Sequence, residues 1–221
     1  ESTKTMTMNQ LEEFKNENVG LVLKMHHANN SRYDRHMLMN GSLQQIKRTE
    51  KKCKIYWIHG AMTEKEIHGL YTHPQIDAYV TTTHGEGFGL PMFEAAYSGM
   101  PVVAPGWSGH LDFLRIPRGK KTENMYERIR CEVKNLEEEH QMPGILMPYM
   151  KWAYSDPASV RKCMRNVMEN IKVKKRMALR LKTYLEETFS IDDQYKKICS
   201  TCEEQFNQKS IWDKETGQIK I

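Results

Sequence analysis

Three glycines and two glutamates lie close together in the segment from Thr83 to Glu94. The glycines Gly85, Gly87 and Gly89 can bring backbone N–H groups close to a ligand, because no side chain shields them. Pro91 suits the first turn of a helix, so a helix is expected directly behind the glycines. The positive end of that helix would favour a diphosphate, and the segment therefore predicts a phosphate-binding loop.

The two glutamates narrow this prediction. Glu86 lies inside the loop, and Glu94 lies near the first turn of the expected helix. A carboxylate can accept hydrogen bonds from both hydroxyls of a diol, so one glutamate suits a sugar ring and the other a ribose. The alternative is that Glu94 only stabilises the helix N-terminus and that Glu86 is solvated. Together with the glycines, the pair favours a nucleotide-sugar site.

Two other phosphate-binding motifs are excluded by spacing. The glycines follow a GxGxG pattern after a later strand, whereas the dinucleotide fingerprint is GxGxxG after the first strand. No Gly-Lys-Ser/Thr sequence follows the glycines, so the segment is not a P-loop.

Strand-like and helix-like segments alternate around this loop. Apolar runs of strand length, typical of parallel strands buried on both faces, occur at residues 19–25, 53–58, 76–81 and 100–104. Helices are expected at residues 9–17, 37–47, 63–71 and 91–98, the third with a Thr63–Glu66 capping box. Residues 26–34 are expected to form a loop. The alternation predicts an α/β fold with a doubly wound, Rossmann-like parallel sheet. Ligands of such sheets bind at the carboxyl ends of the strands, where the glycines lie.

The second half of the chain has a different character. Residues 115–150 are charged and poorly patterned, which predicts an irregular, solvated insertion. Ser155-Asp156-Pro157 begins a helix that runs to Asn170, and a second helix covers residues 172–188. We therefore expect one nucleotide-sugar-binding domain over residues 1–190, followed by a C-terminal helix and tail over residues 191–221.

The segment from Glu86 to Ala104 resembles the signature of retaining glycosyltransferases of the GT-B fold, the GT4 type or glycosyltransferase group 1 family. The shared pattern is E-G-F-G-L-P, two residues, E-A, and then G-x-P-V-V-A. The resemblance extends over residues 9–190 and is specific over residues 79–114. Some of its variants resemble virus-encoded and bacterial members. It implies the C-terminal half of a GT-B fold, with C-terminal helices, although no segment corresponds to that domain's first strand.

The resemblance also implies roles for single residues. Glu86 would lie against the transferred sugar as the catalytic candidate, and Glu94 would bind the ribose. The donor base would lie near the turn from His59 through Gly60 to Met62. The residues expected around the donor sugar and diphosphate are His84, Gly87, Phe88, Gly89 and Leu90.

Other candidates rest on position alone. Lys24 ends a predicted strand and is a candidate diphosphate ligand, because the family's usual Arg and Lys would precede this chain. His84 either orients the loop or approaches the sugar. Ser108, Gly109 and His110 follow another strand, where a donor-site role and a packing turn are equally expected.

No cofactor or metal is expected, since lysines, arginines and the helix dipole would offset the charge of the diphosphate. The donor itself would be of the UDP or GDP type. His26 and His27 are adjacent and so cannot easily bind one metal ion. Cys199 and Cys202 form an isolated CxxC without a second pair, which makes a zinc site there a weak hypothesis.

Composition limits the function classes. The formal charge of +5 is too small to indicate nucleic-acid binding by itself. The chain has no run of 18 apolar residues and no signal-peptide pattern at its start. Five scattered cysteines favour a reducing compartment, so a cytoplasmic protein is expected.

The predicted function is therefore transfer of a sugar from a nucleoside-diphosphate sugar, with retention, to a glycan, protein or lipid acceptor. The length of 221 residues leaves room for one GT-B half, so the N-terminal domain would lie in the same protein or in another chain. One alternative is a non-catalytic donor-fold module with a structural or assembly role. Another is a DNA-modifying sugar transferase, favoured by the basic run at residues 172–176.

Overall fold

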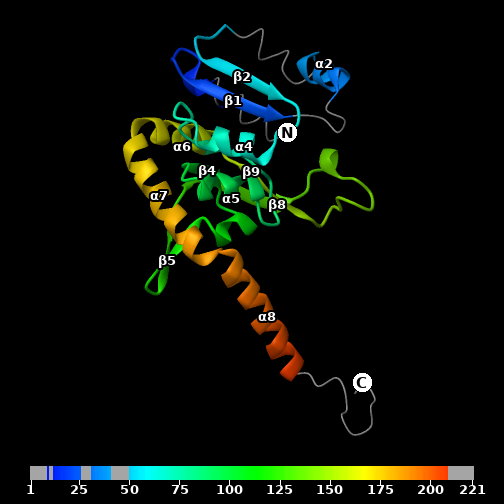
Figure 1. Ribbon diagram of the computed structural model, residues 1–221. Coiled ribbons are helices and arrows are strands. Elements are labelled where there is room, and N and C mark those ends of the chain that lie inside the picture. Colours follow the sequence, from blue (N-terminus) through cyan, green and yellow to red (C-terminus); the bar gives the residue numbers. More distant parts are fainter. Residues whose placement is uncertain (1–8, 10–11, 26–30, 41–49, 209–221) are drawn as a thin grey trace. The chain divides into compact units, whose positions relative to one another are not determined.

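The computed structural model describes residue 9 and residues 12–25, 31–40 and 50–208 (Figure 1). The chain divides into two compact units, Glu1–Lys182 and Thr183–Ile221. All the strands that the structure describes belong to the first unit, as does the glycine-rich loop. The second unit holds α8 (Ile191–Gln208), which begins after Ser190, whose hydroxyl accepts the Asp193 N–H at 3.2 Å.

The parallel strands of the first unit form two groups. Strands β1 (Gly20–Met25) and β2 (Lys54–His59) pair in parallel. Strands β3 (Tyr79–Val80), β4 (Val102–Pro105) and β7 (Glu127–Ile129) form a three-stranded parallel sheet in the order β3-β4-β7. Helices separate most of these strands along the chain, which confirms the α/β class.

Local sequence signals set most helix ends. The helices of the first unit are α2 (Arg32–Asn40), α4 (Glu64–Tyr71), α5 (Leu90–Tyr97), α6 (Pro157–Glu169) and α7 (Ile171–Thr188), which runs into the second unit. The predicted capping box of α4 is present, because the Thr63 hydroxyl accepts the Glu66 N–H and the Glu66 carboxylate accepts the Thr63 N–H. Asp156 caps α6 by accepting the Ala158 N–H at 3.0 Å.

Two predicted boundaries were wrong. Helix α2 begins at Arg32 rather than at residue 37, since Ser31 already starts the helix by accepting the Arg35 N–H at 3.1 Å. The end predicted for this helix lies outside the described residues. Strand β3 is shorter than its apolar run, with only Tyr79 and Val80 paired to β4.

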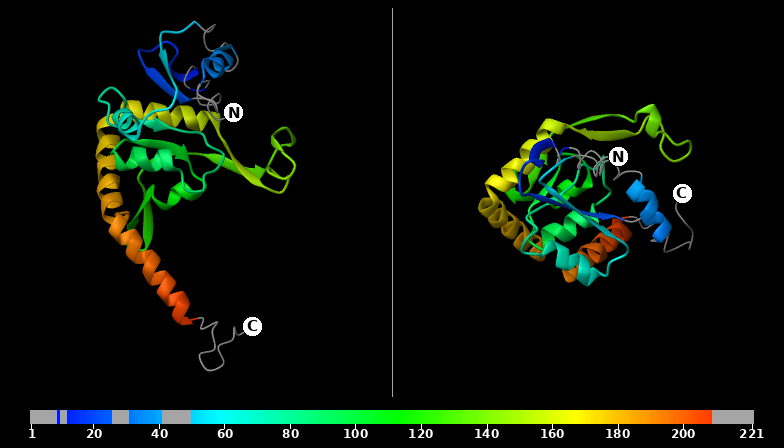
Figure 2. Two further views of the ribbon diagram at one scale, coloured as in Figure 1. Left: turned by 45° about the vertical axis from the view of Figure 1, so that its right-hand side comes forward. Right: turned by 90° about the horizontal axis from the view of Figure 1, so that it is seen from above.

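The irregular insertion predicted for residues 115–150 was also wrong, because this region forms antiparallel ribbons. Strands β5 (Arg115–Arg118) and β6 (Lys121–Asn124) pair around Gly119, which has a φ of 60°. Strand β8 (Cys131–Asn135) pairs with β9 (Lys151–Ser155), and the 3₁₀ helix η2 (Glu138–His140) lies between them. Figure 2 shows the β8–β9 ribbon in yellow-green, reaching out from the rest of the first unit. A two-stranded ribbon exposed over much of its surface tolerates the charge that suggested irregular structure.

A cluster of buried side chains joins α6 to the three-stranded sheet. Its sheet members are Val103 in β4 and Ile129 in β7, and Val160 and Val167 come from α6. Phe14, in the N-terminal segment, is 2% exposed and belongs to the same cluster. This cluster holds the strands whose ends carry the glycine-rich loop.

Candidate functional site

The glycine-rich segment connects β3 to α5 at the carboxyl ends of the parallel strands. Gly89 is the N-cap residue of α5, with φ 90° and ψ 54°. A Cβ on Gly89 would lie 2.8 Å from the Met92 side chain and 3.3 Å from that of His110. Only glycine fits this left-handed, crowded position, and the backbone therefore reaches the helix end without a side chain in the way.

The start of α5 offers donors to an anion. The Gly89 carbonyl accepts the N–H groups of Met92 and Phe93, both at 3.0 Å. Among the described residues, the N–H groups of Gly87 and Leu90 are bonded to no backbone oxygen. They lie at the positive end of the helix, which is the arrangement that binds phosphate groups in other proteins.

Glu86 is held on both its backbone and its side chain. Its N–H donates to the Ser108 hydroxyl at 2.9 Å, and its carbonyl accepts the Gly109 N–H at 3.1 Å. The Thr83 hydroxyl donates to carboxylate oxygen Oε1 of Glu86 at 2.9 Å. The side chain is half-buried, so the carboxylate is oriented while part of it still reaches the surface.

Glu86 and Glu94 both influence the half-buried phenol of Tyr79. Burial is the largest cause that raises the pKa of Tyr79 to about 12, and the carboxylates of Glu86 and Glu94 contribute to the same rise. Glu94 is exposed on α5, and it also contributes to the raised pKa of Tyr71, whose largest cause is burial. Glu94 lies in the second turn of α5, not in the first turn as predicted, because the helix already begins at Leu90.

His84 is tied to the β8–β9 ribbon. Its carbonyl accepts the Ala153 N–H, and its Nδ1 lies 2.9 Å from the Ala153 carbonyl. Nδ1 must therefore carry a proton, because a carbonyl only accepts. The imidazole stacks on Trp152 with ring centroids 4.5 Å apart and planes 9° apart. These contacts favour the orienting role over contact with a sugar.

His110 is fully buried beneath the loop. Its Nε2 donates to the Pro105 carbonyl at 2.8 Å, and burial lowers its pKa. Its Nδ1 is buried and has no partner among the described residues. A neutral ring in this place supports the glycine loop from below, beside Gly89.

The residues expected around the base lie at the end of β2. His59 ends the strand, Gly60 is buried with a φ of 114°, and Met62 precedes the capping residue of α4. Helix α4 packs against α5. The indole Nε1 of Trp57 and Nε2 of His59 are buried without partners among the described residues.

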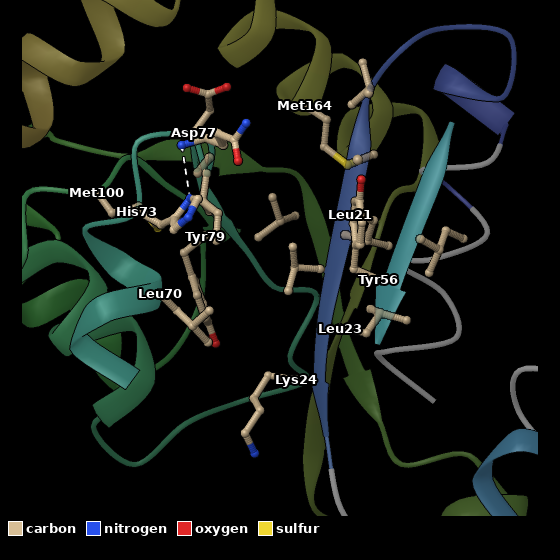
Figure 3. A pocket seen from close by; sticks show the side chains of 18 of the residues that line it. Leu21, Leu23, Lys24, Tyr56, Leu70, His73, Asp77, Tyr79, Met100 and Met164 are labelled. Atoms are coloured by element: carbon tan, nitrogen blue, oxygen red, sulfur yellow. Dashed lines mark hydrogen bonds between the residues drawn. The ribbon is translucent and has the colours of Figure 1, made fainter. Parts of the chain in front are cut away.

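Lys24 lines a cavity of about 1380 Å³ between β1 and β3 (Figure 3). Leu21 and Leu23 of β1 lie on one side of this cavity, and Leu70 and Tyr79 lie on the other. Its lining includes Thr81 and Thr82 but none of the residues from 84 to 90. The cavity is therefore separate from the glycine loop, and Lys24 is placed at the carboxyl end of β1 as expected.

One group in the described part of the chain could hold a metal ion. The ligand atoms of Glu137, Glu139 and His140 lie within 4.8 Å of one another. Lys134 Nζ is 2.5 Å from the Glu137 carboxylate, and His140 Nε2 is 3.5 Å from Glu139. These ion pairs account for the cluster without a metal.

The predicted donor segment included Thr83 but gave its hydroxyl no role, and sequence reasoning missed Tyr79 and Trp152. Tyr79 lies shortly before the loop in sequence, and a search of neighbouring aromatic residues would have included it. Trp152 is far from the loop in sequence, and only strand pairing brings it to His84.

The fold is that of the GT-B glycosyltransferases. Sucrose-phosphate synthase from Thermosynechococcus elongatus superimposes with a TM-score of 0.58 at 13% identity, over 94% of this chain and 42% of that protein. The catalytic domain of starch synthase IV from Arabidopsis thaliana, bound to ADP and acarbose, gives 0.44 at 12% identity, over 93% of this chain and 42% of that one. The chain thus spans less than half the length of either protein. No curated protein matches its sequence.

The family described as "Family 4 Glycosyltransferase in conflict systems" matches residues 72–198, more than half of the chain. The chain belongs to this GT4-conflict family. The match includes the whole glycine-rich segment, α5, both ribbons and α7. Because this is a family of glycosyltransferases, sugar transfer is its general activity. No described helix is both long and apolar enough to cross a membrane.

Proposed function

We propose that this GT4-conflict chain is the donor-binding half of a retaining glycosyltransferase that uses a nucleoside-diphosphate sugar. The observation that carries the proposal is that Thr83 and Ser108 hold Glu86 in the loop leading into the N-terminus of α5, while Glu94 lies in the second turn of the same helix. A diphosphate on the helix N-terminus would have one carboxylate toward its sugar and one toward its ribose.

Each group then has a distinct task. The N–H groups of Gly87 and Leu90 bind the diphosphate and stabilise the charge that develops on the leaving group. Glu86 accepts hydrogen bonds from the sugar near its reacting carbon. Attack by the acceptor from the face of the leaving diphosphate would retain the anomeric configuration. No metal or other cofactor takes part. Lys24 lines the separate cavity between β1 and β3, so the N-terminus of α5 is left to offset the charge of the diphosphate.

The remaining parts of the site are assigned by position. The turn from His59 to Met62 receives the base of a UDP- or GDP-type donor. The acceptor, whether glycan, protein or lipid, is recognised by an N-terminal GT-B domain in the same or another chain. Transfer depends on that domain, because alignment of donor and acceptor provides much of the rate.

The basic run on α7 gives less support to a DNA-modifying enzyme. Lys174 pairs with Glu127, and Lys175 pairs with Asp77 at 2.7 Å. Two of its charges therefore hold the helix onto the domain, and fewer remain for phosphate groups of a nucleic acid.

Calorimetric titration with UDP, GDP and their sugar conjugates tests the proposal. Glu94→Gln should weaken the preferred nucleotide about 10- to 100-fold, because a charge-assisted hydrogen bond to a diol is lost. Glu138→Gln, an exposed glutamate on η2, is the matched control and should bind like the wild type. Equal affinity of Glu94→Gln and the control would reject Glu94 as the ribose ligand.

A further inference from the structure

Ser108 has a backbone conformation that serine rarely adopts. Its φ is 88° and its ψ is −173°, a region occupied almost entirely by glycine. Among the residues that the structure describes, it is the one non-glycine residue with positive φ. A glycine here would remove the strain, so the serine side chain must be explained by what its hydroxyl contacts.

The hydroxyl of Ser108 binds both polar groups of the Glu86 backbone. It accepts the Glu86 N–H at 2.9 Å and donates to the Glu86 carbonyl at 2.6 Å. The next residue adds a third bond, from the Gly109 N–H to the same carbonyl at 3.1 Å. The turn after β4 therefore fixes the position of the Glu86 backbone in the neighbouring loop.

The contact between the two turns is close. A Cβ on Gly109 would lie 1.9 Å from the Gly87 carbonyl oxygen, so the backbones touch at this point. Ser108 is half-buried, and its Oγ also lies 3.6 Å from where a Cβ of Gly85 would be. The strained conformation of Ser108 brings its hydroxyl to Glu86, while the next residue, Gly109, lies against the Gly87 backbone.

We propose that Ser108 is a positioning residue that fixes Glu86 against the donor sugar, an inference that rests on the proposed function. Thr83 orients one carboxylate oxygen, and Ser108 fixes the backbone from which that carboxylate extends. Loss of the hydroxyl would free the Glu86 backbone and misplace its carboxylate. The ribose contact at Glu94, on α5, would be unaffected. The Gly87 N–H shares a peptide unit with the Glu86 carbonyl, so its contact with the diphosphate would weaken as well.

Three variants separate positioning from a merely structural role. Ser108→Gly removes the hydroxyl and the strain, Ser108→Ala removes only the hydroxyl, and Ser108→Thr keeps the hydroxyl while adding a β-branch at positive φ. Stability should therefore be higher in Ser108→Gly than in Ser108→Ala, and lowest in Ser108→Thr. Sugar recognition should follow the hydroxyl instead of the melting temperature.

Isothermal titration of the full chain with UDP and UDP-glucose, and with GDP and GDP-mannose, measures sugar recognition. The ratio of nucleotide to nucleotide-sugar Kd should fall about 10-fold or more in the glycine and alanine variants and be kept in the threonine variant. Nucleotide affinity should fall less than nucleotide-sugar affinity in the glycine and alanine variants and stay within about 2-fold of wild type in the threonine variant. A ratio that follows the melting temperatures, or one unchanged in Ser108→Gly, would overturn the positioning role.

Hydrogen exchange at the Glu86 amide distinguishes failure of this inference from failure of the proposed function. If the wild type binds none of the four ligands, the donor-site proposal is wrong. The Glu86 amide must still exchange about 10-fold or more faster in Ser108→Gly and Ser108→Ala than in wild type and Ser108→Thr. Equal exchange in all four proteins would show that Ser108 does not fix Glu86.

Discussion

The conformation of the glycine loop depends on the absence of a side chain at Gly109. Gly109 leaves no room for a methyl group, because its Cβ would meet the backbone of Gly87 at 1.9 Å. The loop and the turn beneath it can therefore approach only where this residue has no side chain.

Gly109→Ala should lower the free energy of unfolding by about 1–3 kcal/mol, since backbone atoms must move apart to admit the Cβ. Urea unfolding measures the change. Gly119→Ala is a useful comparison, because that glycine has open space around its Cβ position and only a positive φ of 60° to resist substitution. Equal destabilisation by the two variants would mean that the Gly87 contact is not responsible.

His110 should make stability depend on pH. Its pKa in the folded protein lies below the ordinary value of 6.5, because burial disfavours the charged ring. Well above pH 6.5 the ring is neutral in both states and contributes no pH dependence. As the pH falls below that value, the unfolded chain takes up a proton that the folded chain refuses, so stability falls by up to about 1.4 kcal/mol per pH unit.

His110→Gln removes this titration and retains a donor for the Pro105 carbonyl. Urea unfolding between pH 7.5 and 5.5 should show a smaller loss of stability in the variant than in the wild type. If both proteins lose the same free energy over this range, His110 is not the group responsible.

At the residue scale, the sequence predicted a helix directly behind the three glycines, and Gly89 is indeed the N-cap residue of α5. The roles of Glu86 and Glu94 toward a donor stay predictions. The hydrogen bonds between the Ser108 hydroxyl and the Glu86 backbone could not be predicted, because Glu86 lies in the turn after β3 and Ser108 in the turn after β4. How these two turns pack against each other depends on the assembled sheet.

Among the elements, the β8–β9 ribbon is the one that reaches the loop from a distant part of the sequence. Trp152 stacks on His84, and the Ala153 backbone bonds both the carbonyl and the ring of that histidine. The ribbon therefore holds the start of the loop at His84.

Trp152→Ala should lower the free energy of unfolding by about 2 kcal/mol, because stacking and apolar burial against His84 are lost. It should also increase hydrogen exchange at the Ala153 amide. Tyr149→Ala, in the segment between β8 and β9, is the control, since Tyr149 is 72% exposed. A Trp152 variant as stable as the control would show that the stack does not hold the loop.

Elements with local signals were predicted well, and those defined by distant pairing were not. The capping box of α4 lies within a few residues of the start of that helix. The same is true of Gly89 and Pro91 at the start of α5. Strand β9 bonds to a histidine 69 residues earlier in the chain. The charged sequence between residues 115 and 150 gives no sign of that partner, and its strands were therefore missed.

For the whole molecule, the parallel α/β unit, the GT4-conflict match and the GT-B fold agree. The chain covers 42% of the length of sucrose-phosphate synthase, which is consistent with one half of such an enzyme. The partner domain, the acceptor and retention stay predictions. We propose that this half binds a nucleotide sugar, with the diphosphate on the N-terminus of α5.

A crystal structure of the chain with the nucleotide sugar that binds most tightly tests this claim most directly. We predict the diphosphate against the N–H groups of Gly87 and Leu90, the ribose hydroxyls on Glu94, and the sugar within hydrogen-bond distance of Glu86. A nucleotide bound instead in the cavity between β1 and β3, with the glycine loop empty, would contradict the account.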